Sequence, residues 1–116
     1  MHELTITRRI VDAVAARAEG RDVTKVTVEI GRLSGVVADA VAFCFDVCAE
    51  GTAVEDAELE IVETAGRGRC HACATDFAMT TLYDACPACG RRGAERIAGE
   101  ELNILSFEVQ SEREVA

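Results

Sequence analysis

Two Cys-x-x-Cys pairs, Cys70–Cys73 and Cys86–Cys89, constrain this chain more than any other feature of its sequence. Twelve residues separate the pairs, which is enough for a short hairpin that brings them together. Four thiolates arranged in this way can surround one ion, and tetrahedral Zn²⁺ is the usual guest of four sulfurs. Two disulfides or four ordinary thiols are the alternative, which the regular pairing disfavours. The spacing therefore predicts a metal-binding ribbon.

The predicted zinc is structural, because a shell of four thiolates leaves no coordination position for a reactive water. Pro87 and Gly90 favour a tight turn whose backbone amides point at sulfur. His71 lies inside the first pair, and we interpret it as an exposed loop residue instead of a ligand. Rubredoxin-like electron transfer through iron stays open as an alternative, since Cys-Pro-x-Cys-Gly also occurs in such centres, and it would make the protein red.

A structural metal suits a chain that has few large side chains for its core. The protein has 116 residues, of which 49% are hydrophobic but only 4% are aromatic. Its net charge of −9 argues against non-specific binding to nucleic acid or to an anionic membrane surface. A zinc ribbon that binds nucleic acid still stays open, because five arginines lie around the cysteine pairs: Arg67, Arg69, Arg91, Arg92 and Arg96.

The sequence predicts a cytoplasmic protein. No apolar run approaches the length of a membrane span, and charges stand where a signal peptide would have its apolar region. Cysteines spaced as metal ligands also fit a reducing compartment better than a disulfide framework does.

Hydrophobic periodicity predicts two helices and three strands. Residues 4–18 and 39–49 have helical spacing, whereas residues 23–31, 57–64 and 102–109 alternate as strands do. The expected inner faces of the helices are Leu4, Ile10, Val11, Val14 and Ala18 in the first, and Val41, Cys44, Phe45 and Cys48 in the second. We interpret Cys44 and Cys48 as core residues and not as a second metal or redox pair.

The expected fold class is α+β, with two helices packed on a small, about three-stranded sheet and an inserted four-cysteine zinc-ribbon subdomain. The predicted domains are 1–65 plus 100–116 for the α+β body and 66–99 for the ribbon. Glycine-containing segments at 66–68 and 90–99 are expected to act as hinges. The side chains expected to cover the ribbon are Phe77, Met79, Leu82 and Tyr83.

The N-terminus reads Met1-His2-Glu3, and it offers a second set of metal ligands. The amine of Met1, the backbone nitrogen of His2 and its imidazole can form two fused chelate rings on one ion. Such nitrogen-rich donor sets suit Ni²⁺ or Cu²⁺, and Glu3 could add an oxygen. A frayed terminus is the alternative, which the physics of these residues alone favours.

The chain resembles the HypA/HybF family of hydrogenase maturation factors over essentially its whole length. The matching features are the opening Met1-His2-Glu3, Glu29-Ile30-Gly31 followed by Leu33-Ser34, both Cys-x-x-Cys pairs, and Leu105-Ser106-Phe107-Glu108. The resemblance implies a nickel-binding metallochaperone, not an enzyme and without catalytic residues. Such a protein delivers Ni²⁺ during assembly of nickel–iron hydrogenase, with the GTPase HypB and the hydrogenase large-subunit precursor as partners.

The resemblance also implies the ligands of both metals. Nickel, the transient cargo, would bind at His2 with Met1 and Glu3, and structural zinc would bind Cys70, Cys73, Cys86 and Cys89. Some members have an acidic residue shortly after the Leu-Ser turn, where this chain has Val37, which cannot ligate, and a shifted Asp39. Some also have histidines next to the cysteine pairs, where this chain has Thr75 and Gly90.

Overall fold

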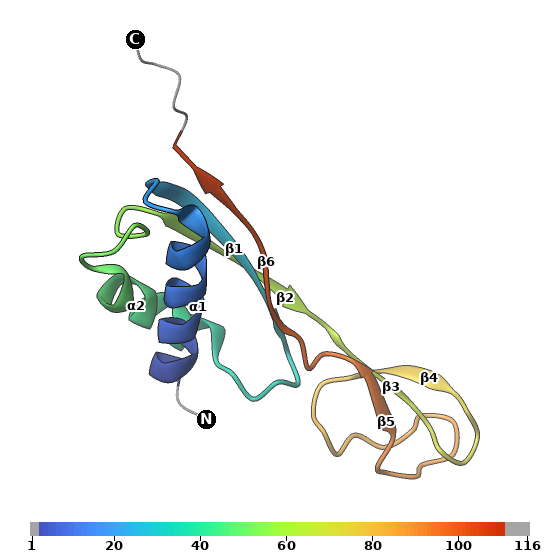
Figure 1. Ribbon diagram of the computed structural model, residues 1–116. Coiled ribbons are helices and arrows are strands. Elements are labelled where there is room, and N and C mark those ends of the chain that lie inside the picture. The colour runs from blue at the N-terminus through green and yellow to red at the C-terminus, as the bar shows by residue number, and fades with distance from the viewer. Residues whose placement is uncertain (1–2, 111–116) are drawn as a thin grey trace. The chain divides into compact units, whose positions relative to one another are not determined.

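The computed structural model describes residues 3–110 as helices α1 and α2 and strands β1 to β6 (Figure 1). Their bounds are α1 Glu3–Ala18, β1 Val23–Gly31, α2 Ala38–Ala49, β2 Glu58–Thr64, β3 Gly66–Arg69, β4 Asp76–Met79, β5 Glu95–Ala98 and β6 Leu102–Val109. Both predicted helices and all three predicted strands are confirmed, as is the α+β class. Among the described residues, no helix combines the length and apolarity needed to cross a bilayer.

The chain divides into two compact units, which are described separately. The first holds residues 3–28, 37–61 and 104–110 of the described chain, and therefore contains both helices. The second holds Glu29–Val36 and Val62–Asn103, and contains both cysteine pairs. The domain limits drawn from the sequence, 1–65 plus 100–116 and 66–99, stay a prediction.

Helix α1 buries one continuous stripe in the first unit. Its members recur every three or four residues, as on one face of a helix: Ile6, Thr7, Ile10, Val11, Val14 and Ala18. The buried hydroxyl of Thr7 donates a hydrogen bond of 2.7 Å to the carbonyl of Glu3, so no polar group of this side chain is left unpaired. The expectation that Leu4 is buried is wrong. It lies in the first turn at the edge of the stripe, and 53% of its surface is exposed.

Helix α2 packs against α1 and buries Val41, Phe45 and Cys48. The Sγ of Cys48 lies 4.0 Å from the Leu4 carbonyl, and Arg8 donates a hydrogen bond of 3.1 Å from its Nη1 to the Cys48 carbonyl. That cation stands near the C-terminal end of α2, where the helix dipole favours positive charge. The core position of Cys48 is confirmed, whereas Cys44 is only half-buried at the edge of the contact.

The long sheet has the order β2-β1-β6, with β1 in the middle. The strands β1 and β2 run in the same direction, joined through α2, and β6 runs against them (Figure 1). Val26, Val28 and Ile30 of β1 are buried, as the alternating pattern predicts. On the other side of the strand Glu29 accepts hydrogen bonds from Thr64 at 2.6 Å and Asn103 at 3.1 Å. These two bonds, that of Thr64 above all, hold the pKa of Glu29 below its ordinary value.

The second unit has a sheet of its own, with the order β4-β3-β5 and antiparallel pairing on both sides of β3. The segment 66–68, which is expected from the sequence to be a hinge, lies within strand β3. Glycine is required there by close packing and not for mobility. A Cβ on Gly66 would come within 2.5 Å of the Met79 carbonyl oxygen and 2.7 Å of the Leu33 side chain.

The core of this unit is small and includes sulfur. Its members are Leu33, Cys70, Phe77, Met79, Cys86 and Ala94. The expected covering roles of Phe77 and Met79 are therefore confirmed, whereas those of Leu82 and Tyr83 are wrong, since 37% and 74% of their surfaces are exposed. Leu33 takes part instead, because the segment 29–36 belongs to this unit.

Candidate metal centre

The first cysteine pair forms the tight turn between β3 and β4. The amide of Cys70 donates to the Thr75 carbonyl at 2.9 Å, and the amide of Ala74 donates back to the Cys70 carbonyl at 3.0 Å. Within the turn, the amide of Ala72 points at the Cys70 Sγ from 3.4 Å. Backbone amides aimed at sulfur stabilise its thiolate form.

The second pair repeats this turn. The amide of Cys86 donates to the Arg91 carbonyl at 2.8 Å, and the amide of Gly90 donates to the Cys86 carbonyl at 2.8 Å. The amide of Ala88 lies 3.4 Å from the Cys86 Sγ, as in the first pair. The two pairs therefore lie in two separate loops that have the same pattern of backbone hydrogen bonds.

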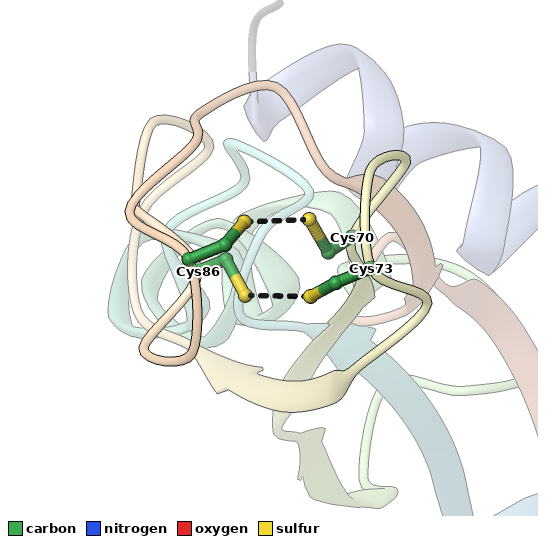
Figure 2. Close-up of side chains that lie close together, drawn as sticks. Cys70, Cys73 and Cys86 are labelled. Carbon is green, nitrogen blue, oxygen red and sulfur yellow. Dashed lines mark hydrogen bonds between the residues drawn. The ribbon is translucent and has the colours of Figure 1, made fainter.

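All four sulfurs come together between the two loops. Sγ of Cys70 lies 3.4 Å from that of Cys89, Sγ of Cys73 lies 3.6 Å from that of Cys86, and all four lie within 4.8 Å of one another. Figure 2 shows Cys70 and Cys73 facing Cys86 across the centre. Sulfurs at a zinc–thiolate bond length of ~2.3 Å stand about 3.8 Å apart in a tetrahedron. The donor set fits one ion of this kind.

The cluster is half inside the core and half at the surface. The first cysteine of each pair, Cys70 and Cys86, is buried, whereas Cys73 and Cys89 are exposed. All six cysteines of the chain are free. His71 is exposed and lies outside the group of four sulfurs, as expected of a loop residue.

The surroundings of the sulfurs favour negative charge on the first pair. Hydrogen bonds from the hydroxyl and then the amide of Thr75 lower the pKa of Cys73 to about 6, and the backbone amides of Cys73 and Ala72 lower the pKa of Cys70. The amide of Arg91 lowers the pKa of Cys89. The Cys70 sulfur and burial have the opposite and larger effect, so that the pKa of Cys89 is raised to about 11. The lowered pKa values of Cys73 and Cys70 favour the thiolate form, which is the form that a divalent cation binds.

Thr75 is a contributor that sequence reasoning missed. Its Oγ1 lies 3.1 Å from the Cys73 Sγ. The signal was present in the sequence, since a hydroxyl two residues after a cysteine can reach back to its sulfur. From the sequence alone, the position stands out only as one where some members of the resembling family have histidine.

The predicted nickel ligands are only partly covered by the structure, because Met1 and His2 lie outside the described residues. Glu3 begins α1, and its Oε2 accepts a hydrogen bond of 3.1 Å from the amide of Val37. Val37 is the N-cap residue of α2 and has no side-chain cap of its own. A carboxylate at this place matches the positive end of the helix dipole. Glu3 therefore joins the start of α1 to the start of α2.

The two cysteine loops differ at the position that follows their second cysteine, which gives a test of their geometry. Ala74 has φ of 63° where Gly90 has 79°, so both adopt the left-handed conformation that costs a non-glycine residue about 1–2 kcal/mol. We expect Ala74→Gly to stabilise the zinc-loaded protein and Gly90→Ala to destabilise it, by about 1 kcal/mol each. Thermal unfolding of the two variants beside wild type measures this. Ala72→Gly is the control, and equal shifts for Ala72→Gly and Ala74→Gly would refute the assignment.

Comparison with known families matches nearly the whole chain. A family model described as "HypA: Hydrogenase/urease nickel incorporation, metallochaperone, hypA" matches residues 1–109. The matched range therefore includes Met1-His2-Glu3 and both cysteine pairs.

Individual relatives and solved structures agree with this match. Hydrogenase maturation factor HypA of Geobacter sulfurreducens is 49% identical over 110 residues, which is 95% of this chain and 100% of the relative. HypA of Rippkaea orientalis is 46% identical, over 95% and 96% of the two chains. The solution structure of the Ni metallochaperone HypA from Helicobacter pylori is 26% identical with a TM-score of 0.67, covering 97% of this chain and 100% of that one.

Proposed function

Because this chain belongs to the HypA family of hydrogenase/urease nickel-incorporation metallochaperones, we propose that it carries Ni²⁺ at its N-terminus and delivers it during maturation of nickel–iron hydrogenase. The observation that carries the proposal is the extent of the family match, which begins at residue 1 and so takes in Met1-His2-Glu3. Nickel is cargo here and not a resident cofactor.

The proposed nickel ligands are His2 with Met1 and Glu3. An amine, a backbone nitrogen and an imidazole give the nitrogen-rich donor set that Ni²⁺ accepts in tetragonal geometry. A carrier must also release its ion, and a site with few protein ligands at a chain terminus suits release better than a buried cage does. The contact between Glu3 and the Val37 amide supports the site, since it fixes the residue that follows His2 to the start of α2.

The proposed metal of the four-cysteine cluster is structural zinc, held by Cys70, Cys73, Cys86 and Cys89. When bound, zinc supplies a fixed tetrahedral link between the two cysteine loops. The chain supplies the thiolates and the backbone amides aimed at Cys70 and Cys86. Iron would accept the same four sulfurs, so metal analysis and colour of the purified protein decide between the ions. We expect a colourless protein with one zinc.

The proposed partners are the GTPase HypB and the precursor of the hydrogenase large subunit, and the proposed location is the cytoplasm. The protein would act by binding and handing over an ion, without catalysis. Nucleic-acid binding by the ribbon gains little support from its arginines. Arg69 pairs with Asp76 at 2.8 Å, Arg96 pairs with Glu100 at 2.8 Å, and Arg92 donates to the Tyr83 carbonyl.

An extended N-terminus tests the function directly. Adding two residues in front of Met1 removes the free amine from the proposed donor set while leaving every side chain in place. We expect nickel binding to weaken at least about tenfold and zinc content to stay at one per chain. Isothermal titration with Ni²⁺ and zinc analysis of the same samples measure both. The same two residues added after Ala116 are the control. Full nickel affinity in the N-terminally extended protein would contradict the proposal.

A further inference from the structure

Helix α2 leaves an apolar strip uncovered beside the start of α1. Phe43 and Val47 lie one turn apart on the same side of α2, with 77% and 53% of their surfaces exposed. The start of α1 lies beside this helix, because the Leu4 carbonyl is 4.0 Å from the Sγ of Cys48 on the buried face of α2. We call Phe43 and Val47 the α2 strip. Large apolar side chains exposed next to each other can form an interaction surface.

The strip has an acidic border. Asp39, Asp46 and Glu50 are all exposed, and the helical spacing puts them in one row next to Phe43 and Val47. Within residues 3–110 their carboxylates take part in no ion pair or side-chain hydrogen bond. The helix itself has no Lys or Arg. The nearby guanidinium of Arg8 is engaged by the Cys48 carbonyl.

We propose that the α2 strip and its acidic border dock a basic amphipathic segment of a different protein. Apolar side chains of that segment would cover Phe43 and Val47, and its Lys or Arg residues would face the acidic row. A second copy of this chain fits less well, because a two-fold contact sets the same row of carboxylates against itself. The proposal rests on described residues of the first unit and does not require the nickel site.

Titration with designed peptides tests the partner chemistry. The probe is a fluorescein-labelled, amidated peptide of about 18 residues, five turns of helix, with leucine on one face and lysine on the other. The matched probe has glutamate in place of lysine. Fluorescence anisotropy at low salt is expected to show binding of the lysine peptide that is at least about tenfold tighter than that of the glutamate peptide, and that weakens as salt is added.

Variants locate the binding surface. Phe43→Ser is expected to weaken binding of the lysine peptide at least about tenfold, as loss of a central apolar anchor does. Asp46→Asn combined with Glu50→Gln is expected to weaken it several-fold and to flatten its salt dependence. Tyr83→Ser is the matched control, because Tyr83 is an equally exposed aromatic residue of the second unit, and it should bind as wild type does. Circular dichroism confirms that all variants are folded.

Three results would overturn the proposal. The first is absence of binding of the lysine peptide at concentrations up to ~1 mM, which corresponds to about −4 kcal/mol. The second is equal weakening by Phe43→Ser and Tyr83→Ser, or equal affinity for both peptides, which would indicate non-specific hydrophobic contact. The third is a dimer in sedimentation velocity that Phe43→Ser dissociates, which would assign the strip to a second copy of the chain. Nickel binding of the same proteins is measured in parallel. Absence of nickel binding would contradict the proposed function and not the proposed docking surface.

Discussion

Cys70→Ser is expected to weaken zinc binding strongly and to unfold the loops that carry the cysteine pairs. Cys70 is buried in a core of six residues that also contains Cys86, so we expect this core to depend on the proposed ion. The free energy of zinc binding is about 10–16 kcal/mol in small zinc peptides. If each of the four thiolates supplies a quarter of it, loss of one weakens zinc affinity roughly 10²–10³-fold. Zinc content by mass spectrometry and competition with a chromogenic chelator measure the loss.

The matched control is Cys44→Ser. Cys44 is a half-buried free thiol outside the cluster, so its replacement should leave one zinc per chain. Amide spectra separate the two units of the structure. Cys70→Ser should collapse the dispersion of signals from residues 66–99 while signals from α1 and α2 persist. Retention of zinc with wild-type affinity by Cys70→Ser would refute the four-sulfur assignment.

His2→Ala is expected to remove nickel binding and to leave zinc untouched. The substitution deletes the imidazole donor and with it one of the two chelate rings proposed for the N-terminus. Because loss of a group behind a ligand already costs 10–100-fold in metal affinity, loss of the ligand itself should cost at least about 100-fold. Calorimetric titration with Ni²⁺ of the zinc-loaded protein gives the affinity of each variant.

The protein has a second histidine that serves as the control. His71 is exposed and lies inside the first cysteine loop, so His71→Ala changes the histidine content equally. It should bind nickel as wild type does. If His71→Ala lost nickel and His2→Ala kept it, the nickel site would belong to the ribbon and the proposed N-terminal site would be wrong.

The long elements could be predicted because burial acts on one face of each. Val26, Val28 and Ile30 alternate in β1, and Ile10, Val11 and Val14 follow the helical period in α1, so pattern and burial agree. The predictions of burial that were wrong concern residues at the ends of such patterns. Leu4 continues the apolar period of α1, but at the first turn the helix extends past the surface that would cover it.

The second sheet could not be predicted because its strands are short and made of unusual residues. Gly66-Arg67-Gly68-Arg69 has the composition of a loop, yet the side chains of Leu33 and Met79 fill the space beside the glycines and the segment pairs on both sides. Such an arrangement depends on contacts between distant residues. Strand order and direction in the β2-β1-β6 sheet likewise follow from long-range pairing and are not encoded in any local pattern.

The cysteine cluster was predictable because metal ligands have a fixed spacing, and the structure brings the four sulfurs together as expected. The contacts that support Cys73 and Glu3 could not be predicted. The hydrogen bonds from Thr75 to Cys73 and from Val37 to Glu3 depend on where loops place a hydroxyl and an amide. Leu33 reaches the core beside Cys70 from a turn that shows no apolar period.

Native mass spectrometry of the untagged protein, loaded with equimolar Zn²⁺ and Ni²⁺, tests the central claim most directly. The account predicts a species with one zinc and one nickel for wild type, and a species with one zinc and no nickel for His2→Ala. A His2→Ala protein that still carries both ions would contradict the proposal that this chain holds its nickel cargo at the N-terminus.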